Sequence, residues 1–282
     1  MMSRVIDVHV HLTPPEIAGN RERFLAGEGA WAQIYRDPKA RMATTDDLLA
    51  AMDGEGVDVS LVMGFPWSNE DTAKRHNEWL LEQAARHPSR LKPLAAFDAL
   101  APWAPRHAES MLRAGMAGLG ELALYDRGFG PAELEALGAL GELCGRENRL
   151  FLMHVNEPIG HQYPGKAPLE IGQIHALAQG CQNVKLILAH FGGGLPFFAA
   201  LKKEVKNYFH NIFFDTAAMP FLFDPAALPM ALKILGPEHF LLGTDFPLLK
   251  TSRYRKYFAE AGLAPEIIAQ IMGSNAEKLL EM

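Results

Sequence analysis

Short apolar runs alternate with longer amphipathic stretches about every 30–40 residues, the rhythm of repeated strand and helix units. We predict eight strands, at residues 5–12, 57–63, 91–97, 118–124, 150–155, 184–190, 212–216 and 240–244. Helical patterns occupy residues 45–52, 69–87, 103–114, 131–147, 168–178, 195–208, 225–235, 265–272 and 275–280. No composition break marks a second domain, so the pattern predicts an α/β protein, a single (β/α)8 TIM barrel over residues 1–282.

Two features of the pattern leave alternatives open. A doubly wound sheet would show the same alternation, but the glycine-rich phosphate-binding turn is missing after the first strand. Residues 13–43 follow that strand without clear periodicity and contain Pro14, Pro15 and several glycines. A stretch of this length is a functional loop, or it contains short helices.

The composition argues against large charged partners. The formal net charge is −6, so no basic field attracts nucleic acid or an anionic membrane surface. No apolar run reaches the roughly 18 residues of a spanning helix, and no apolar leader follows Met1. Cys144 and Cys181 lack zinc-like spacing, which indicates reduced thiols. We expect a cytoplasmic protein without a nucleic-acid or membrane partner.

Three polar side chains occupy alternate positions of the first strand. Strict alternation places Asp7, His9 and His11 on one face and the apolar residues 6, 8, 10 and 12 on the other. The two histidines then lie about 6–7 Å apart at their Cα atoms, within reach of one divalent metal. On this pattern Asp7 faces the barrel interior below the metal, where it either orients a histidine or makes a structural hydrogen bond. One such pair also fits ordinary core histidines, so the later strands decide.

Four further strands end on a side chain that can bind a metal. Glu121 lies near the end of the fourth strand, and His154, His190 and Asp245 end the fifth, sixth and eighth. These ends meet at one mouth of a barrel, where active sites lie. A zinc ion there would make hydroxide available near neutral pH, with an aspartate accepting the proton of the water. One ion could be surrounded by His9, His11, His154 and Asp245, leaving His190 and Glu121 for a second ion or for the water.

These motifs resemble the amidohydrolase superfamily of metal-dependent hydrolases. The endings Ala189-His190-Phe191-Gly192-Gly193 and Gly243-Thr244-Asp245-Phe246-Pro247 are similar to its amidohydrolase-related branch (amidohydrolase 2), as is the closing stretch 273–280. The resemblance covers essentially the whole chain. It implies a small-molecule substrate, a homodimer, catalysis by Asp245 and His190, with His190 hydrogen-bonded to the catalytic water, and one ion on His9, His11, His154 and Asp245.

Gly120-Glu121 departs from that branch and resembles the TatD-like deoxyribonucleases, in which a glutamate of the fourth strand bridges two ions. Many other members of the superfamily place a carboxylated lysine there, and this chain has none nearby. Glu121 is therefore either a bridging ligand, with His190 completing a binuclear site, or a carboxylate that orients another ligand. One ion is favoured and two remain open.

Substrate contacts are predicted from loops over the metal, because strand-end loops carry such contacts. Trp67 follows the second strand, where it would either wall the pocket or pack on a helix. The loop after the fifth strand is equally consistent with solvated side chains, and its candidates are Asn156, Glu157, His161, Tyr163 and Lys166.

The main hypothesis is a metal-dependent hydrolase of a lactone, ester or amide. The alternative is a metal-dependent, non-oxidative decarboxylase of a small aromatic or unsaturated acid, in which Arg36 or Arg41 could hold the leaving carboxylate. A TatD-like phosphoester hydrolase comes third, because the net charge of −6 disfavours a polyanionic substrate.

Overall fold

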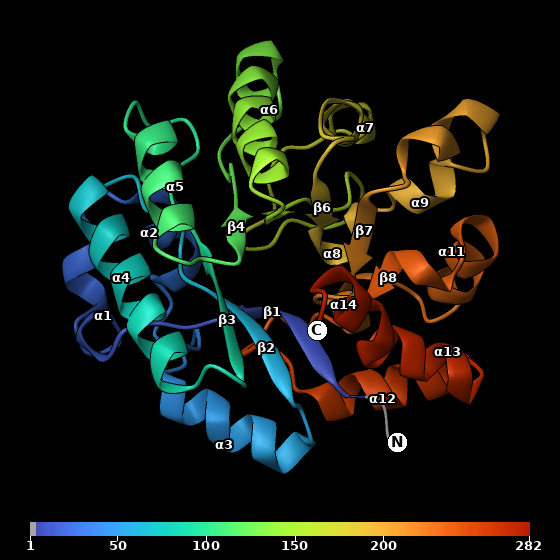
Figure 1. Cartoon of the computed structure of the whole chain (residues 1–282), viewed down its shortest axis with the longest axis horizontal. Helices are drawn as coiled ribbons and strands as arrows, with labels where there is room; N and C mark the ends of the chain where they lie inside the picture. The colour runs from blue at the N-terminus through green and yellow to red at the C-terminus, as the bar shows by residue number, and fades with distance from the viewer. Residues whose placement is uncertain (1–3) are drawn as a thin grey trace.

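The computed structural model describes residues 4–282. Its strands are Ile6–His11 (β1), Val59–Met63 (β2), Leu91–Ala95 (β3), Gly118–Leu122 (β4), Leu150–Met153 (β5), Lys185–Leu188 (β6), Ile212–Asp215 (β7) and Phe240–Leu241 (β8). They are parallel and lie in sequence order, β1 to β8, with helices around them (Figure 1).

The sheet closes on itself through the segment that follows β8. Val8 N donates to Leu242 O at 2.8 Å, and His11 N donates to Phe246 O at 2.8 Å. Between them, Asp245 N donates to His9 O at 2.9 Å. The (β/α)8 barrel is therefore confirmed, and its closing seam holds Asp245 beside His9.

Residues 13–43 contain three short helices, which is one of the two predicted alternatives. Elsewhere the helical segments depart from the prediction. The predicted helix 195–208 is interrupted at Lys202, whose backbone is extended (φ −135°, ψ 122°). The sequence prediction missed α12, where Tyr254, Tyr257 and Phe258 form a narrow apolar face in a charged stretch. The helices and turns are Pro15–Gly19 (α1), Arg21–Phe24 (η1), Gly29–Tyr35 (α2), Thr45–Glu55 (α3), Glu70–Arg86 (α4), Ala104–Arg113 (α5), Pro131–Arg146 (α6), Ile171–Gly180 (α7), Ala189–Gly192 (α8), Leu195–Phe198 (α9), Lys203–Tyr208 (η2), Met219–Leu222 (α10), Ala227–Leu235 (α11), Pro237–His239 (η3), Thr251–Glu260 (α12), Pro265–Ala269 (α13), Gln270–Ser274 (η4) and Asn275–Leu279 (α14).

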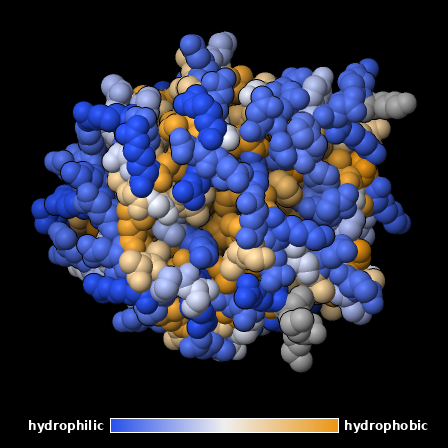
Figure 2. All heavy atoms as spheres, in the orientation of Figure 1, coloured by the Kyte–Doolittle hydropathy of each residue, from blue (hydrophilic) through white to orange (hydrophobic). Residues whose placement is uncertain are grey.

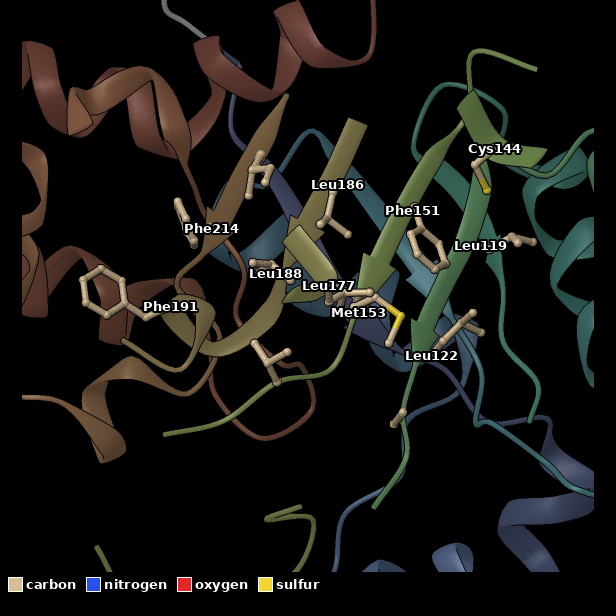
Figure 3. Packing of buried hydrophobic residues seen from close by; sticks show 14 of the residues in the cluster. Leu119, Leu122, Cys144, Phe151, Met153, Leu177, Leu186, Leu188, Phe191 and Phe214 are labelled. Atoms are coloured by element: carbon tan, nitrogen blue, oxygen red, sulfur yellow. The ribbon is translucent and has the colours of Figure 1, made fainter. Parts of the chain in front are cut away.

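Two apolar clusters form the core. The inner one fills the barrel with residues such as Ile6, Leu61 and Ile187, and α14 packs against it. The larger one lies between the strands and the helices; Figure 3 shows part of it, with Leu119, Phe151 and other side chains of β4–β7 packed together. In the view of Figure 2 the outer surface is mainly hydrophilic, with scattered apolar patches. Among the described residues, no helix combines the length and the apolar character needed to cross a bilayer.

A register shift in β1 reverses the predicted faces. Ile6 and Val8 belong to the inner cluster, but Val10 and Leu12 belong to the outer one, and the pairing with β2 shifts between Asp7 and Val10. Asp7 therefore lies outside the barrel, in a small cavity beside α3. The prediction that Asp7 faces the interior with His9 and His11 is wrong, because a bulge breaks the alternation on which it rested.

A second shift turns Glu121 toward the barrel mouth. Leu119 and Leu122 both pack in the outer cluster, and the pairing of β4 with β5 shifts between them. Two glycines allow β4 to lie against β5 at this point. A Cβ atom on Gly118 would lie 2.2 Å from the Leu150 carbonyl oxygen, and one on Gly120 would lie 2.6 Å from Leu152 Cβ.

Candidate metal centre

A cavity of about 670 Å³ opens at the C-terminal ends of the strands. His11, Glu121, His154, His190 and Asp245 line it. Aromatic residues from α2 and from the segments after β2 and β4 form part of its wall, namely Tyr35, Phe65 and Tyr125. A volume of this size accommodates a small organic ligand.

Nitrogen and oxygen donors from β1 and β4 and from the segments after β6 and β8 converge at the mouth of the barrel. His9 Nε2 lies 3.1 Å from His11 Nε2 and 3.6 Å from Glu121 Oε1. Asp245 Oδ1 lies 3.4 Å from His11 Nε2, and His190 Nε2 lies 3.5 Å from Glu121 Oε1. Two groups of three donors therefore share His9, namely His9 with His11 and Asp245, and His9 with Glu121 and His190.

The hydrogen bonds of the two histidines of β1 show that this cluster fits a cation. His9 Nδ1 lies 2.8 Å from Asp215 Oδ2, and His11 Nδ1 lies 3.2 Å from Gly64 O, so each imidazole donates its N–H away from the cluster. Both Nε2 lone pairs then face each other at 3.1 Å, which requires a proton or a metal ion between them. Donor separations of this size suit one ion with bonds of about 2.0–2.2 Å to imidazole and carboxylate.

The electrostatic field of the cluster is negative. Burial would lower the pKa of His9, but the carboxylates of Asp215, Glu121 and Asp245 raise that pKa to about 10. Burial would raise the pKa of Glu121, but His154 and His9 hold it well below its usual value. The carboxylates are therefore ionised, which is the form that binds a divalent metal.

Asp215, at the end of β7, orients two of these residues and was missed at the sequence level. Its Oδ2 accepts from His9 Nδ1, and its Oδ1 accepts from the backbone N–H groups of His190 at 2.9 Å and Ala217 at 3.0 Å. His190 lies in α8, just beyond β6, and has a left-handed backbone (φ 51°, ψ 51°). The available signal was an acidic residue at a strand end, the same signal that identified Asp245.

Replacing Asp215 with asparagine should weaken metal binding about 10- to 100-fold, the usual effect of losing a partner behind a metal-binding histidine. An amide offers one acceptor oxygen, which cannot serve both His9 and the backbone of His190. Competition of the metal-loaded protein with a chelator measures the affinity. Asp224→Asn is the matched control, because Asp224 is exposed and, among the described residues, its carboxylate accepts only from Ala226 N within its own loop. An unchanged affinity in Asp215→Asn would show that Asp215 does not orient the ligands.

Asp7 lies away from the donor cluster, and its carboxylate connects β1 to the segment after β8 by hydrogen bonds. Its Oδ2 accepts from Thr244 Oγ1 at 2.5 Å, and its Oδ1 accepts from Thr244 N at 3.0 Å and from His9 N at 3.2 Å. Asp7 thus holds the backbones of both His9 and the residue before Asp245 from outside the barrel.

His154 lies at the edge of the donor cluster. Its Nδ1 lies 3.0 Å from Glu121 Oε1, and its Nε2 lies 2.9 Å from Gly165 O. Because Nε2–H donates to that carbonyl, the contact between Nδ1 and the Glu121 carboxylate requires a proton or a metal ion between them, as at His9 and His11. His154 is outside the two groups of three donors, so its assignment as a ligand stays a prediction.

A family model described as amidohydrolase matches residues 6–282. This protein belongs to the amidohydrolase family. γ-Resorcylate decarboxylase from Polaromonas sp. (strain JS666 / ATCC BAA-500) is 23% identical over 255 residues, covering 75% of this chain and 77% of that protein.

Solved structures of decarboxylases share the barrel of this amidohydrolase. 5-Carboxyvanillate decarboxylase from Sphingomonas paucimobilis has a TM-score of 0.72 at 18% identity, and the match covers 99% of both chains. Dihydroxybenzoic acid decarboxylase from Polaromonas sp. JS666, with bound manganese and the inhibitor 2-nitroresorcinol, has a TM-score of 0.70 at 18% identity, covering 99% of this chain and 97% of that one. At these identities the similarity shows the fold alone.

The loop after β5 of this amidohydrolase is held by an ion pair between a buried lysine and a partly buried glutamate. Lys166 Nζ donates to Glu157 Oε1 at 2.7 Å and to the carbonyl oxygens of residues 159 and 161, and Tyr163 OH donates to Glu157 Oε2 at 2.9 Å. His161 and Tyr163 line the cavity. Asn156 is fully buried and outside the lining, where its amide bonds Ala167 N and O and joins the two ends of the loop.

Lys166→Met should destabilise the protein by about 3 kcal/mol, because it leaves the Glu157 carboxylate without its buried partner. The double variant Glu157→Gln/Lys166→Met should lose less than the sum of the single changes. Urea denaturation measures both. Lys185→Met is the control: its partner Glu281 has a side chain that is 63% exposed, so the loss should stay below about 1 kcal/mol. Equal losses in Lys166→Met and Lys185→Met would contradict a stabilising role of the buried pair.

Trp67 lies behind the cavity wall, not on it. It is fully buried, its ring centroid lies 5.1 Å from that of Phe65, and its Nε1–H donates to His76 Nδ1 at 2.9 Å. His76 Nε2–H donates to Leu12 O at 2.9 Å. Phe65, two residues before Trp67, forms the wall in its place.

The free energy of unfolding should decrease as the pH is lowered, because of His76. Burial lowers the pKa of His76 from 6.5 to about 4, so the unfolded chain binds a proton more readily and the contribution is lost as pH falls from 6.5 toward 4. Between pH 7 and pH 5 the loss should be about 2 kcal/mol. The measurement compares urea denaturation of the wild type with His76→Gln, which lacks this titration. Parallel pH dependences of the two proteins would contradict the assignment.

Proposed function

We propose that this amidohydrolase is a metal-dependent, non-oxidative decarboxylase of a small aromatic acid. The observation that carries the proposal is the pair of facing Nε2 lone pairs of His9 and His11, 3.1 Å apart, beneath a cavity walled by aromatic rings. The decarboxylases among its relatives and structural neighbours support the reaction class.

The residues that would hold the ion are His9, His11 and Asp245, with Glu121, His190 and His154 beside them. A bound divalent ion would neutralise the carboxylates and attract an oxygen of the acid. Zinc follows from the donor chemistry, and manganese is present in a solved neighbour, so the identity of the ion is part of the test. The two groups of three donors share His9, so a site with one ion is favoured and a site with two ions remains an alternative.

Asp245 is the residue to which we assign proton transfer. In decarboxylation the bond between ring carbon and carboxylate carbon breaks, the electron pair stays on the ring, and a proton from solvent replaces the carbon dioxide that leaves. The side chain of Asp245 is 19% exposed and lines the cavity. Burial would raise its pKa, but His11, His9 and His190 lower it, so it is an ionised carboxylate that can accept and pass on a proton.

Hydrolysis of a lactone, ester or amide is the second candidate. Glu121 favours it, because a carboxylate beside His9 and His190 can hold a water or a second ion next to the first. The same Asp245 would then accept the proton of the attacking water.

The deciding experiment loads the purified protein with manganese or zinc and follows two reactions. Release of carbon dioxide from 2,6-dihydroxybenzoate or 5-carboxyvanillate would support the decarboxylase. Turnover of a lactone or ester panel without release of carbon dioxide would replace it with the hydrolase. Elemental analysis of the same sample gives the identity and number of ions. The cytoplasmic location and the homodimer stay predictions from the sequence.

A further inference from the structure

Tyr35 and Tyr125 line the cavity, and the proposed metal chemistry assigns no role to either of them. Tyr35 is the last residue of α2, and Tyr125 follows β4. Their rings flank Phe65: the centroid of Tyr35 lies 5.9 Å from that of Phe65, and the centroid of Tyr125 lies 6.2 Å from it on the stacked side. Two phenol groups thus converge from segments about 90 residues apart in sequence.

The hydroxyl groups of these two tyrosines have no hydrogen-bond partner among the described residues, whereas three other tyrosines have one. Tyr163 OH donates to Glu157, Tyr254 OH donates to Thr244 O, and Tyr257 OH donates to Phe223 O. Since Tyr35 and Tyr125 border the cavity, their hydroxyls are available to water or to a ligand there.

Packing fixes the Tyr125 ring in place. It lies 4.9 Å from the His154 ring by centroids, and a Cβ atom on Gly165 would lie 3.8 Å from Tyr125 Cε1. Tyr35 packs against Trp31, with centroids 4.1 Å apart. Rings held in this way present their donors with little further loss of conformational freedom when a ligand binds.

Both hydroxyls are neutral hydrogen-bond donors near neutral pH, because an ordinary phenol has a pKa of about 10. Two phenol donors that face one cavity suit a ligand oxygen that accepts hydrogen bonds.

We propose that Tyr35 and Tyr125 form an oxygen-binding subsite that recognises an anionic or phenolic oxygen of a planar acid in the cavity. The inference rests on the proposed function, because it assumes that a planar acid occupies this cavity. The inference specifies which atom of the ligand the subsite binds. This atom is a carboxylate or ring oxygen that accepts hydrogen bonds from both phenols. Phe65, between the two rings, offers an apolar surface for the ring of the same ligand.

The test measures binding instead of turnover. Manganese-loaded wild type, Tyr35→Phe, Tyr125→Phe and the double variant are titrated with 2,6-dihydroxybenzoate and with benzoate in a calorimeter. Each phenylalanine keeps the ring and removes one donor, so each single change should weaken binding about tenfold. Tyr208→Phe is the matched control, since Tyr208 lies outside the cavity lining and should leave both affinities unchanged. Thermal melting of every variant checks that the fold is intact.

The two probes separate the two oxygens. Weaker binding of both probes supports recognition of the carboxylate, and weaker binding of 2,6-dihydroxybenzoate alone supports recognition of a phenolic oxygen. Unchanged affinities in the double variant, or a wild type that binds neither probe, would overturn the subsite. Failure of the proposed function looks different: the probes bind, the tyrosine variants weaken them, and no carbon dioxide is released.

Discussion

His9→Ala is expected to reduce the metal content of the purified protein to less than about a tenth of the wild-type value. His9 is the residue shared by both groups of three donors, and its Nε2 faces His11 at 3.1 Å, so its loss removes a ligand from either arrangement of ions. Losing only a partner behind a ligand typically costs 10- to 100-fold in affinity, and a ligand itself should cost more. Elemental analysis per chain, after purification without chelator, gives the result.

Two further variants make the His9 result interpretable. His11→Ala should have the same effect, and its side chain is 18% exposed, so this change disturbs the core less than loss of fully buried His9. His210→Ala removes an exposed histidine outside the cavity lining and should keep the full metal content. Full occupancy in both His9→Ala and His11→Ala would rule out the assigned ligands.

Asp245→Asn should lower kcat about 10²- to 10⁴-fold, the contribution of a positioned proton-transfer group. Asparagine keeps the size of the side chain and an oxygen near His11 but cannot carry the proton. The same loss is expected for decarboxylation and for hydrolysis, because Asp245 moves the proton in both. Steady-state kinetics on the best substrate of the deciding assay measures it.

Metal content must be measured alongside kcat for Asp245→Asn. A variant that keeps its metal and loses turnover would support proton transfer by Asp245. A variant that loses both metal and turnover would show that Asp245 acts mainly as a metal ligand. Wild-type kcat in Asp245→Asn would remove it from the chemistry altogether. Asp126→Asn, at an exposed pair with Arg127, is the control for the same change elsewhere.

The closing seam of the barrel explains why Asp245 lies so near the histidines of β1. Asp245 has a left-handed backbone (φ 58°) and donates its N–H to His9 O. Asp7 and Thr244 hold the same seam from the outer side. Non-glycine residues in this conformation persist where surrounding bonds hold them, and they gather at functional sites. His190, with a similar backbone held by Asp215, follows the same rule.

The sequence by itself determined the barrel and most of the donor set. Apolar runs and helical periods are local signals, and the strand-end positions of His9, His11, Glu121, His190 and Asp245 follow from them once the strands are parallel. Periodicity also located β1 to β7 within a few residues, although it extended the eighth strand beyond Leu241.

Only the tertiary structure decided which side chains share a partner. Asp215 reaches His9 across 206 residues, and no local pattern distinguishes it from any other acid at a strand end. The bulges of β1 and β4 move Asp7 out and Glu121 in, because register depends on the neighbouring strand and not on the strand's own alternation. The short helix that carries Tyr35 to the cavity is stabilised by packing against Phe65 and Trp67 through Trp31, contacts that exist only after the barrel has formed.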